Sequence, residues 1–127
     1  MSDFQERWDE ISTKTNQYIK EYFLERFEGG LEGTDKYFEA LEYAVFSGGK
    51  RFRPALVLMT GETFGISDDE LLPYAAAVEL VHAFSLVHDD LPCMDDDDFR
   101  RGNPTVHRKF SEDMALLAGD GLVIEAV

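Results

Sequence analysis

Six aspartates lie within the ten residues from 89 to 98, and oxygen ligands of this kind can hold a divalent cation. An acidic run is most often a solvated surface segment. This run instead follows the largely apolar residues 80–87, with only His88 between them. Adjacent carboxylates at the end of a buried helix cost free energy unless a cation compensates them, and a helix C-terminus disfavours negative charge. The run therefore indicates a metal site.

The chemistry of the ligands favours Mg²⁺. The run offers hard oxygen ligands and no histidine, which suits magnesium better than zinc. Magnesium usually takes one or two protein carboxylates and completes its octahedron with water and substrate phosphates. A calcium-binding EF-hand is the main competitor, but its Asp-x-Asp-x-Asp-Gly spacing with a terminal Glu is absent. The spacing thus argues against a calcium-binding helical protein.

Residues 48–54 read Gly-Gly-Lys-Arg-Phe-Arg-Pro, a composition suited to binding phosphate. Glycines let the backbone approach an anion closely, and a helix beginning at Pro54 would offer its positive end. The spacing of a P-loop, Gly-x-x-x-x-Gly-Lys-Ser/Thr, is absent. A turn that links two helices and carries surface cations is the alternative explanation.

Arg100-Arg101-Gly102 follows the aspartates directly. The guanidinium group presents a fixed fork of donors that matches phosphate oxygens, although simple charge balance against the acidic run is the alternative. Seven cations lie in or beside the two motifs: Lys50, Arg51, Arg53, Arg100, Arg101, Arg108 and Lys109. Together with the aspartates they indicate two bound diphosphates, one held through metal and the other held directly by Arg and Lys.

One histidine is placed to join this site. His82 lies seven residues before Asp89, so at about 100° per residue the two share a helix face, with Ser85 between them. A lone histidine on a helix is usually a core residue, but beside an aspartate site His82 is a candidate donor to a diphosphate. His88 and His107 lack this alignment and are interpreted as structural.

Helices must position these residues. Apolar side chains recur every three or four residues and predict helices over residues 4–27, from 34 or 35 to the glycines at 48 and 49, 54–64, about 71–91 after a capping box at Ser67, and 111–127. Residues 95–104 are predicted to be a loop. No segment alternates strictly, so we predict no sheet. The fold class is all-α, with residues 1–127 as a single domain.

The composition excludes several classes of protein. The formal net charge is −14, with 26 acidic and 12 basic residues, which argues against nucleic acid and anionic membrane surfaces as partners. A single cysteine, Cys93, rules out an intrachain disulfide and favours a cytoplasmic location. No signal peptide is evident at the N-terminus, and the apolar runs are too short to predict a membrane span.

Together, these motifs closely resemble the trans-prenyl diphosphate synthases, the family of the farnesyl and geranylgeranyl diphosphate synthases. Residues 89–95 are similar to the family's first aspartate-rich motif, Asp-Asp-x4-Asp, with its Arg-Arg-Gly tail at 100–102. Residues 48–54 are similar to its Gly-Gly-Lys-Arg-x-Arg-Pro motif. The resemblance covers nearly the whole chain and is closest to bacterial-type farnesyl diphosphate synthases.

The resemblance implies a helical bundle around a deep cavity, truncated here to its N-terminal helices. It implies condensation of isopentenyl diphosphate with an allylic diphosphate, dimethylallyl or geranyl, with Mg²⁺ as cofactor. Carried onto this sequence, Asp89 and Asp95 are the magnesium ligands, with Asp90 in support. Arg100 would contact the allylic diphosphate. The ligands of isopentenyl diphosphate would be Lys50, Arg53, His82 and Arg101.

Bulk just before the first aspartate sets product length in this family. Phe84 and Ser85 lie five and four residues upstream of Asp89. An aromatic floor at Phe84 implies a C15 product, with C20 as the alternative. A homodimer is expected by analogy.

The sequence departs from the family pattern in one respect. The family has a second aspartate-rich motif, which the 127 residues do not contain. The last predicted helix also has no stop signal, which indicates a truncated product and leaves apolar helix faces without partners. A second hypothesis is therefore a catalytically inactive module that binds diphosphate and magnesium, or that assembles with a complete synthase.

Overall fold

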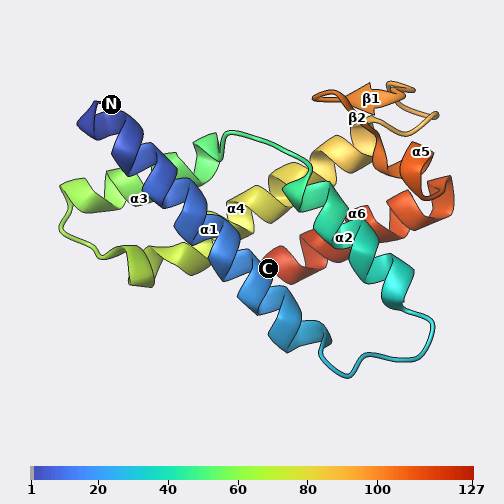
Figure 1. Ribbon diagram of the computed structural model, residues 1–127, viewed down its shortest axis with the longest axis horizontal. Helices are drawn as coiled ribbons and strands as arrows, with labels where there is room; N and C mark the ends of the chain where they lie inside the picture. The colour runs from blue at the N-terminus through green and yellow to red at the C-terminus, as the bar shows by residue number, and fades with distance from the viewer. Residues whose placement is uncertain (1) are drawn as a thin grey trace. The chain divides into compact units, whose positions relative to one another are not determined.

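The computed structural model describes residues 2–127, and most of them are helical, as predicted (Figure 1). In chain order the elements are α1 (Asp3–Phe27), α2 (Asp35–Phe46), α3 (Phe52–Thr63), α4 (Asp68–Asp89), β1 (Phe99–Arg100), β2 (Asn103–Pro104), α5 (Val106–Lys109) and α6 (Glu112–Ala126). The all-α prediction is confirmed, because the strands span only two residues each.

The chain divides into two compact units, which are described separately. The first consists of residues 1–28 and 50–79, and the second of residues 29–49 and 80–127. Helix α4 belongs to the first unit up to Glu79 and to the second from Leu80 onward. That residues 1–127 form a single domain stays a prediction.

The core of the first unit lies between α1, α3 and the start of α4. Ile11, Leu58 and Ala75 are fully buried there, with Trp8 and Leu71 among the side chains packed around them. The helical stripe expected over residues 4–27 supplies the α1 part of this core. Its burial against α3 is the main reason for this unit to hold together.

Polar contacts fix the start of α4 to α1. The guanidinium group of Arg7 donates to both Asp68 oxygens, at 2.7 and 3.1 Å, and the Lys14 Nζ lies 2.7 Å from Asp68 Oδ2. These hydrogen bonds, chiefly those from Arg7, hold the pKa of Asp68 below its usual value. The negative charge of Asp68 also lies in the first turn of α4, where the helix dipole favours it.

In the second unit α6 packs against α2 and α5 (Figure 1). Two glycines allow the close approach. A Cβ on Gly121 would lie within bonding distance of the Tyr37 hydroxyl, and a Cβ on Gly119 would overlap the ring of His88. That ring has its Nε2 3.0 Å from the Leu116 carbonyl oxygen. The structure thus places His88 as a link between α4 and α6, in line with its structural interpretation.

Three details differ from the sequence-based expectation. Helix α3 begins at Phe52, two residues before Pro54, and the short helix α5 was not predicted. The prediction of no sheet is wrong, since β1 and β2 pair in antiparallel fashion. The turn between them has left-handed φ angles at both central residues, 52° at Arg101 and 78° at Gly102, as a type I′ hairpin requires. Strands of two residues are too short to show alternation in a sequence.

Within the described residues, α4 is the one helix long and apolar enough to cross a membrane by length and composition. The core helix of a globular protein meets the same criterion. Glu79, buried within the first unit, is held there by an ion pair. The helix is therefore weak evidence for a membrane span.

Replacing Gly121 with alanine should destabilise the fold by about 1–3 kcal/mol because the new methyl group overlaps the Tyr37 hydroxyl. In an unobstructed helix the same change would stabilise by about 1 kcal/mol. Urea unfolding followed by circular dichroism measures the difference. The double variant Gly121→Ala/Tyr37→Phe should recover most of the loss, and an equal loss in the double variant would show that the hydroxyl is not the obstacle.

Candidate functional site

The aspartate loop folds back onto the end of α4. The backbone N–H of Asp95 donates to the carbonyl oxygen of Asp89 at 2.8 Å, and that of Asp97 donates to the carbonyl of Asp90 at 3.1 Å. These bonds satisfy carbonyl groups that a helix end leaves without partners. They also bring Asp89 and Asp95 together, although five residues separate them in the chain. Both residues are exposed.

This arrangement fits magnesium better than a metal that needs a full protein cage. Among the described residues, no group of three or more His, Cys, Asp or Glu side chains is arranged to hold a metal ion. Two exposed carboxylates on adjoining backbone segments match an ion that takes one or two protein ligands and fills its other positions with water and phosphate oxygens. Asp89 and Asp95 are the residues that could supply them.

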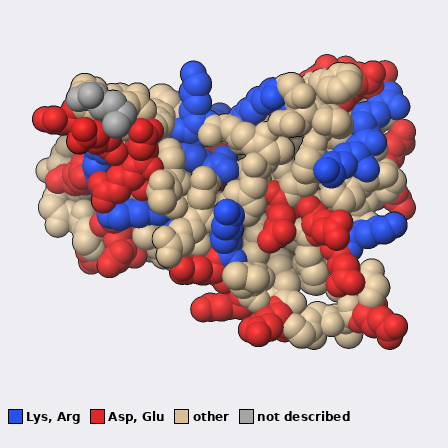
Figure 2. All heavy atoms as spheres, viewed as in Figure 1, with Lys and Arg blue, Asp and Glu red and all other residues tan. Residues whose placement is uncertain are grey.

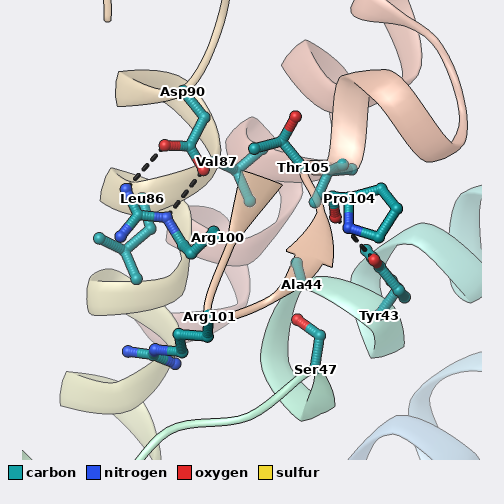
Figure 3. Close-up of a pocket in the computed structure, with 11 residues that line it drawn as sticks. Tyr43, Ala44, Ser47, Leu86, Val87, Asp90, Arg100, Arg101, Pro104 and Thr105 are labelled. Atoms are coloured by element: carbon teal, nitrogen blue, oxygen red, sulfur yellow. Dashed lines mark hydrogen bonds and ion pairs between the residues drawn. The ribbon is translucent and has the colours of Figure 1, made fainter. Parts of the chain in front are cut away.

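Asp90 differs from the other aspartates of the run because it is buried, at 3% exposed. It accepts two hydrogen bonds from Arg100, one from Nε at 2.8 Å and one from Nη2 at 2.7 Å (Figure 3). These bonds raise the pKa of Arg100. One guanidinium group therefore engages both carboxylate oxygens. Asp90 orients the side chain of Arg100 in this way.

The β1–β2 hairpin carries Arg100 and Arg101 and is fastened to the end of α2. The Tyr43 hydroxyl donates to the Pro104 carbonyl oxygen at 2.6 Å (Figure 3), and the amide of Asn103 donates to the Ser47 carbonyl at 3.0 Å. Arg101 Nη1 donates to the Gly48 carbonyl at 2.8 Å. The Arg-Arg-Gly motif is thus in contact with the first glycine of the Gly-Gly motif.

A small cavity of about 30 Å³ lies beneath the hairpin, large enough for about one water molecule. Its polar lining includes Tyr43, Ser47, Asp90, Arg100 and Arg101, while Leu86 and Val87 of α4 supply an apolar wall (Figure 3). The cavity is too small for a prenyl chain. It marks instead how tightly the arginine hairpin packs on α2 and α4.

Lys and Arg side chains gather around the hairpin and α5, next to acidic side chains of the aspartate loop (Figure 2). Two of these cations are already engaged. Arg108 Nε donates to Asp98 Oδ1 at 2.6 Å, and Lys109 Nζ lies 4.5 Å from the centre of the Tyr43 ring. Arg108 and Lys109 therefore contact the loop and α2. Arg100 and Arg101 lie nearer in sequence to the predicted metal ligands.

The predicted residues on α4 are half-buried. The Ser85 hydroxyl donates to the His82 carbonyl oxygen at 2.7 Å, within its own helix. The ring of Phe84 meets that of His88 edge-on, with centroids 5.2 Å apart. Phe84 is therefore held against the histidine that fixes α6. His107 is buried, and neither of its ring nitrogens has a partner among residues 2–127.

Residues 50–54 of the predicted phosphate-binding turn belong to the first unit, and Arg51 holds them in place. Arg51 adopts a left-handed conformation (φ 53°, ψ 39°) and is only 4% exposed. Its Nε donates to Asn16 Oδ1 at 2.6 Å, and its Nη1 to Glu79 Oε1 at 3.0 Å. The indole N–H of Trp8 donates to the Lys50 carbonyl at 2.8 Å.

These contacts give the cations of the turn different roles. Lys50 and Arg53 are exposed on either side of the buried Arg51. The sequence grouped Arg51 with the cations available to phosphate, whereas the structure commits it to a buried ion pair that shapes the turn. Tyr43, Asn16 and Glu79 were missed, since each acts through a contact with a residue at least 28 positions away.

The all-α fold, the aspartate loop and the arginine hairpin define a protein of the isoprenoid synthase type, and comparison with known proteins agrees. The polyprenyl synthetase family model matches residues 34–127, so the chain belongs to the polyprenyl synthetase family.

Several relatives show how far the likeness extends. The chain is 45% identical over 122 residues to the farnesyl diphosphate synthase of Haemophilus influenzae, which covers 96% of this chain and 40% of the relative. It is 60% identical over 84 residues to the farnesyl diphosphate synthase of Escherichia coli, covering 66% of this chain and 28% of the relative. The crystal structure of a geranyltransferase from Legionella pneumophila matches with a TM-score of 0.89 and 40% identity, over 96% of this chain and 41% of that one.

Replacing Arg51 with methionine should destabilise the fold by about 3–5 kcal/mol because it leaves the Glu79 carboxylate buried without a partner. The double variant Arg51→Met/Glu79→Leu removes both charges and should regain most of that stability. Urea denaturation of the three proteins tests this. A double variant as unstable as the single one would show that the pair itself, rather than the stranded charge, supplies the stability.

Proposed function

We propose that this chain forms the diphosphate- and magnesium-binding portion of a trans-prenyl diphosphate synthase. In the proposed reaction an allylic diphosphate, dimethylallyl or geranyl, ionises by breaking its C–O bond and releases diphosphate. The allylic carbocation alkylates the double bond of isopentenyl diphosphate, and loss of a proton restores a double bond. The observation that carries the proposal is the aspartate loop folded onto α4, with Asp90 orienting Arg100, in a chain of the polyprenyl synthetase family.

Asp89 and Asp95 would hold Mg²⁺, which when bound neutralises the charge that develops on the leaving diphosphate. Arg100 would add a guanidinium group to the same diphosphate. Because Asp90 fixes that group in advance, little reorganisation is needed when charge builds on the leaving group.

From the family resemblance we carry over four ligands of isopentenyl diphosphate: Lys50, Arg53, His82 and Arg101. Lys50 and Arg53 are exposed residues of the first unit, with Arg51 shaping the turn between them. His82 and Arg101 belong to the second unit. Three of the four are cations, which suits a diphosphate held without metal.

A farnesyl product, a homodimer and a cytoplasmic location are parts of the same proposal. The farnesyl diphosphate synthases among the relatives support the C15 product by analogy. The alternative function is an inactive module that binds diphosphate and magnesium or assembles with a complete synthase. The 127 residues contain one aspartate-rich motif, and the chain spans 40% of the Haemophilus relative.

A condensation assay separates the two functions. The protein is incubated with Mg²⁺, isopentenyl diphosphate and geranyl diphosphate, and products are resolved by chain length. Formation of a C15 diphosphate supports the synthase. Absence of product together with magnesium-dependent diphosphate binding supports the binding module, and absence of both contradicts the proposed site.

Replacing Asp89 or Asp95 with asparagine should weaken magnesium-dependent binding of inorganic diphosphate by at least about tenfold, as expected when a metal ligand loses its charge. Isothermal titration calorimetry with and without Mg²⁺ measures this. Asp96→Asn is the matched control, because Asp96 lies in the same loop, is exposed and has a left-handed φ of 51° that asparagine tolerates. Equal losses in all three variants would indicate a general charge effect.

Replacing Phe84 with alanine should lengthen the product beyond C15, since it removes the proposed aromatic floor upstream of Asp89. The product distribution of the condensation assay is the readout. Phe64→Ala, which removes an exposed phenylalanine of the first unit, should leave that distribution unchanged. An unaltered product from Phe84→Ala would eliminate the floor.

A further inference from the structure

We propose that Tyr43 and Asn103 are positioning residues that hold Arg100 and Arg101 in the geometry that binds diphosphate. This inference rests on the proposed function and adds two residues that the sequence motifs do not include. Neither side chain carries charge. Each acts through a hydrogen bond between the β1–β2 hairpin and the end of α2.

The hairpin needs outside support. Each strand has two residues, and an isolated two-stranded hairpin is at best marginally stable in water. Its turn also places Arg101 at a left-handed φ of 52°. Residues other than Gly, Asn and Asp adopt this conformation only at a cost in free energy. The two arginines therefore stand on an element that cannot keep its shape alone.

One anchor acts directly opposite Arg100, and the other acts at the neighbouring residue pair of the hairpin. In the hairpin register Arg100 faces Asn103, and Phe99 faces Pro104. Asp90 holds Arg100 on the β1 side, while Asn103 and the Pro104 carbonyl are held on the β2 side by Ser47 and Tyr43. The hairpin is thus fixed from both strands, by Asp90 through β1 and by the end of α2 through β2.

Tyr43 is itself fixed. Its ring meets Phe110 edge-on with centroids 5.8 Å apart, and Lys109 Nζ lies over its face. Burial raises the pKa of Tyr43 above its ordinary value, so the hydroxyl stays protonated and able to donate at neutral pH. A phenylalanine at this position would keep the ring contacts and lose only the hydrogen bond to Pro104.

Positioning leaves donors available for a ligand. Arg100 uses Nε and Nη2 on Asp90, and Arg101 uses Nη1 on Gly48. A guanidinium group has five N–H donors. Among residues 2–127, Nη1 of Arg100 and Nη2 of Arg101 have no other acceptor, so they can donate to phosphate oxygens. Because the hairpin is already ordered, less conformational entropy is lost when a ligand binds.

The test uses Tyr43→Phe and Asn103→Ala, with Tyr37→Phe as the matched control. Tyr37 lies on the same helix, and its hydroxyl faces Gly121 of α6. Calorimetry measures binding of inorganic diphosphate with Mg²⁺, and NMR measures hydrogen exchange of the Arg100 Nε–H in the protein without ligand. Loss of one hydrogen bond should weaken binding by about three- to tenfold and speed the exchange by a similar factor. The control should change neither.

A merely structural role would lower the melting temperature without changing either readout at a temperature where every variant is folded. Wild-type affinity and wild-type Arg100 exchange in Tyr43→Phe would overturn the positioning role while leaving the proposed function intact. If the wild-type protein fails to bind diphosphate with Mg²⁺, the proposed function fails. The exchange measurement still decides the positioning role in that case: faster exchange in Tyr43→Phe supports it, and unchanged exchange overturns it.

Discussion

A buried carboxylate needs a partner, and the organisation of the second unit around Asp90 follows from that requirement. Asp90 sits one residue beyond the end of α4, almost fully shielded from water. The guanidinium group of Arg100 meets both of its oxygens, and a charge-assisted pair of this geometry is strong as well as directional. Since Arg100 lies in β1, the pair fixes the return of the chain after the aspartate loop. The carboxylates of Asp89 and Asp95 are exposed, as the proposed magnesium site requires.

The first unit solves a similar problem in the same way. Arg51 is buried and pairs with Glu79 while its neighbours Lys50 and Arg53 are exposed. In each motif one charged residue forms a buried ion pair, and charged residues beside it in the sequence are exposed. Removing the charge of Arg51 would leave Glu79 buried without a counter-charge. The turn at residues 50–54 therefore depends on this ion pair, although its sequence resembles a simple run of surface cations.

Much of this could be predicted from the sequence. The stripes of apolar residues gave the five long helices to within a few residues, and the spacing of the aspartates, glycines and arginines gave the family that the comparison shows. The hairpin escaped because its strands are two residues long and its turn is Arg-Gly rather than Asn-Gly. The internal roles of Arg51 and Asp90 escaped because a motif lists residue types, while burial and pairing depend on segments that meet only in the folded chain.

The contacts that fasten the arginine hairpin join distant parts of the chain. Tyr43 and Pro104 are 61 residues apart, Ser47 and Asn103 are 56 apart, and Gly48 and Arg101 are 53 apart. Closing loops of this length lowers the entropy of the chain before the contacts can contribute favourable free energy. The backbone hydrogen bonds of α2 and α4 are local in sequence, so we expect the hairpin to dock after these helices on the folding pathway. The polypeptide would then acquire its helical scaffold first and its anion-binding geometry among the last steps.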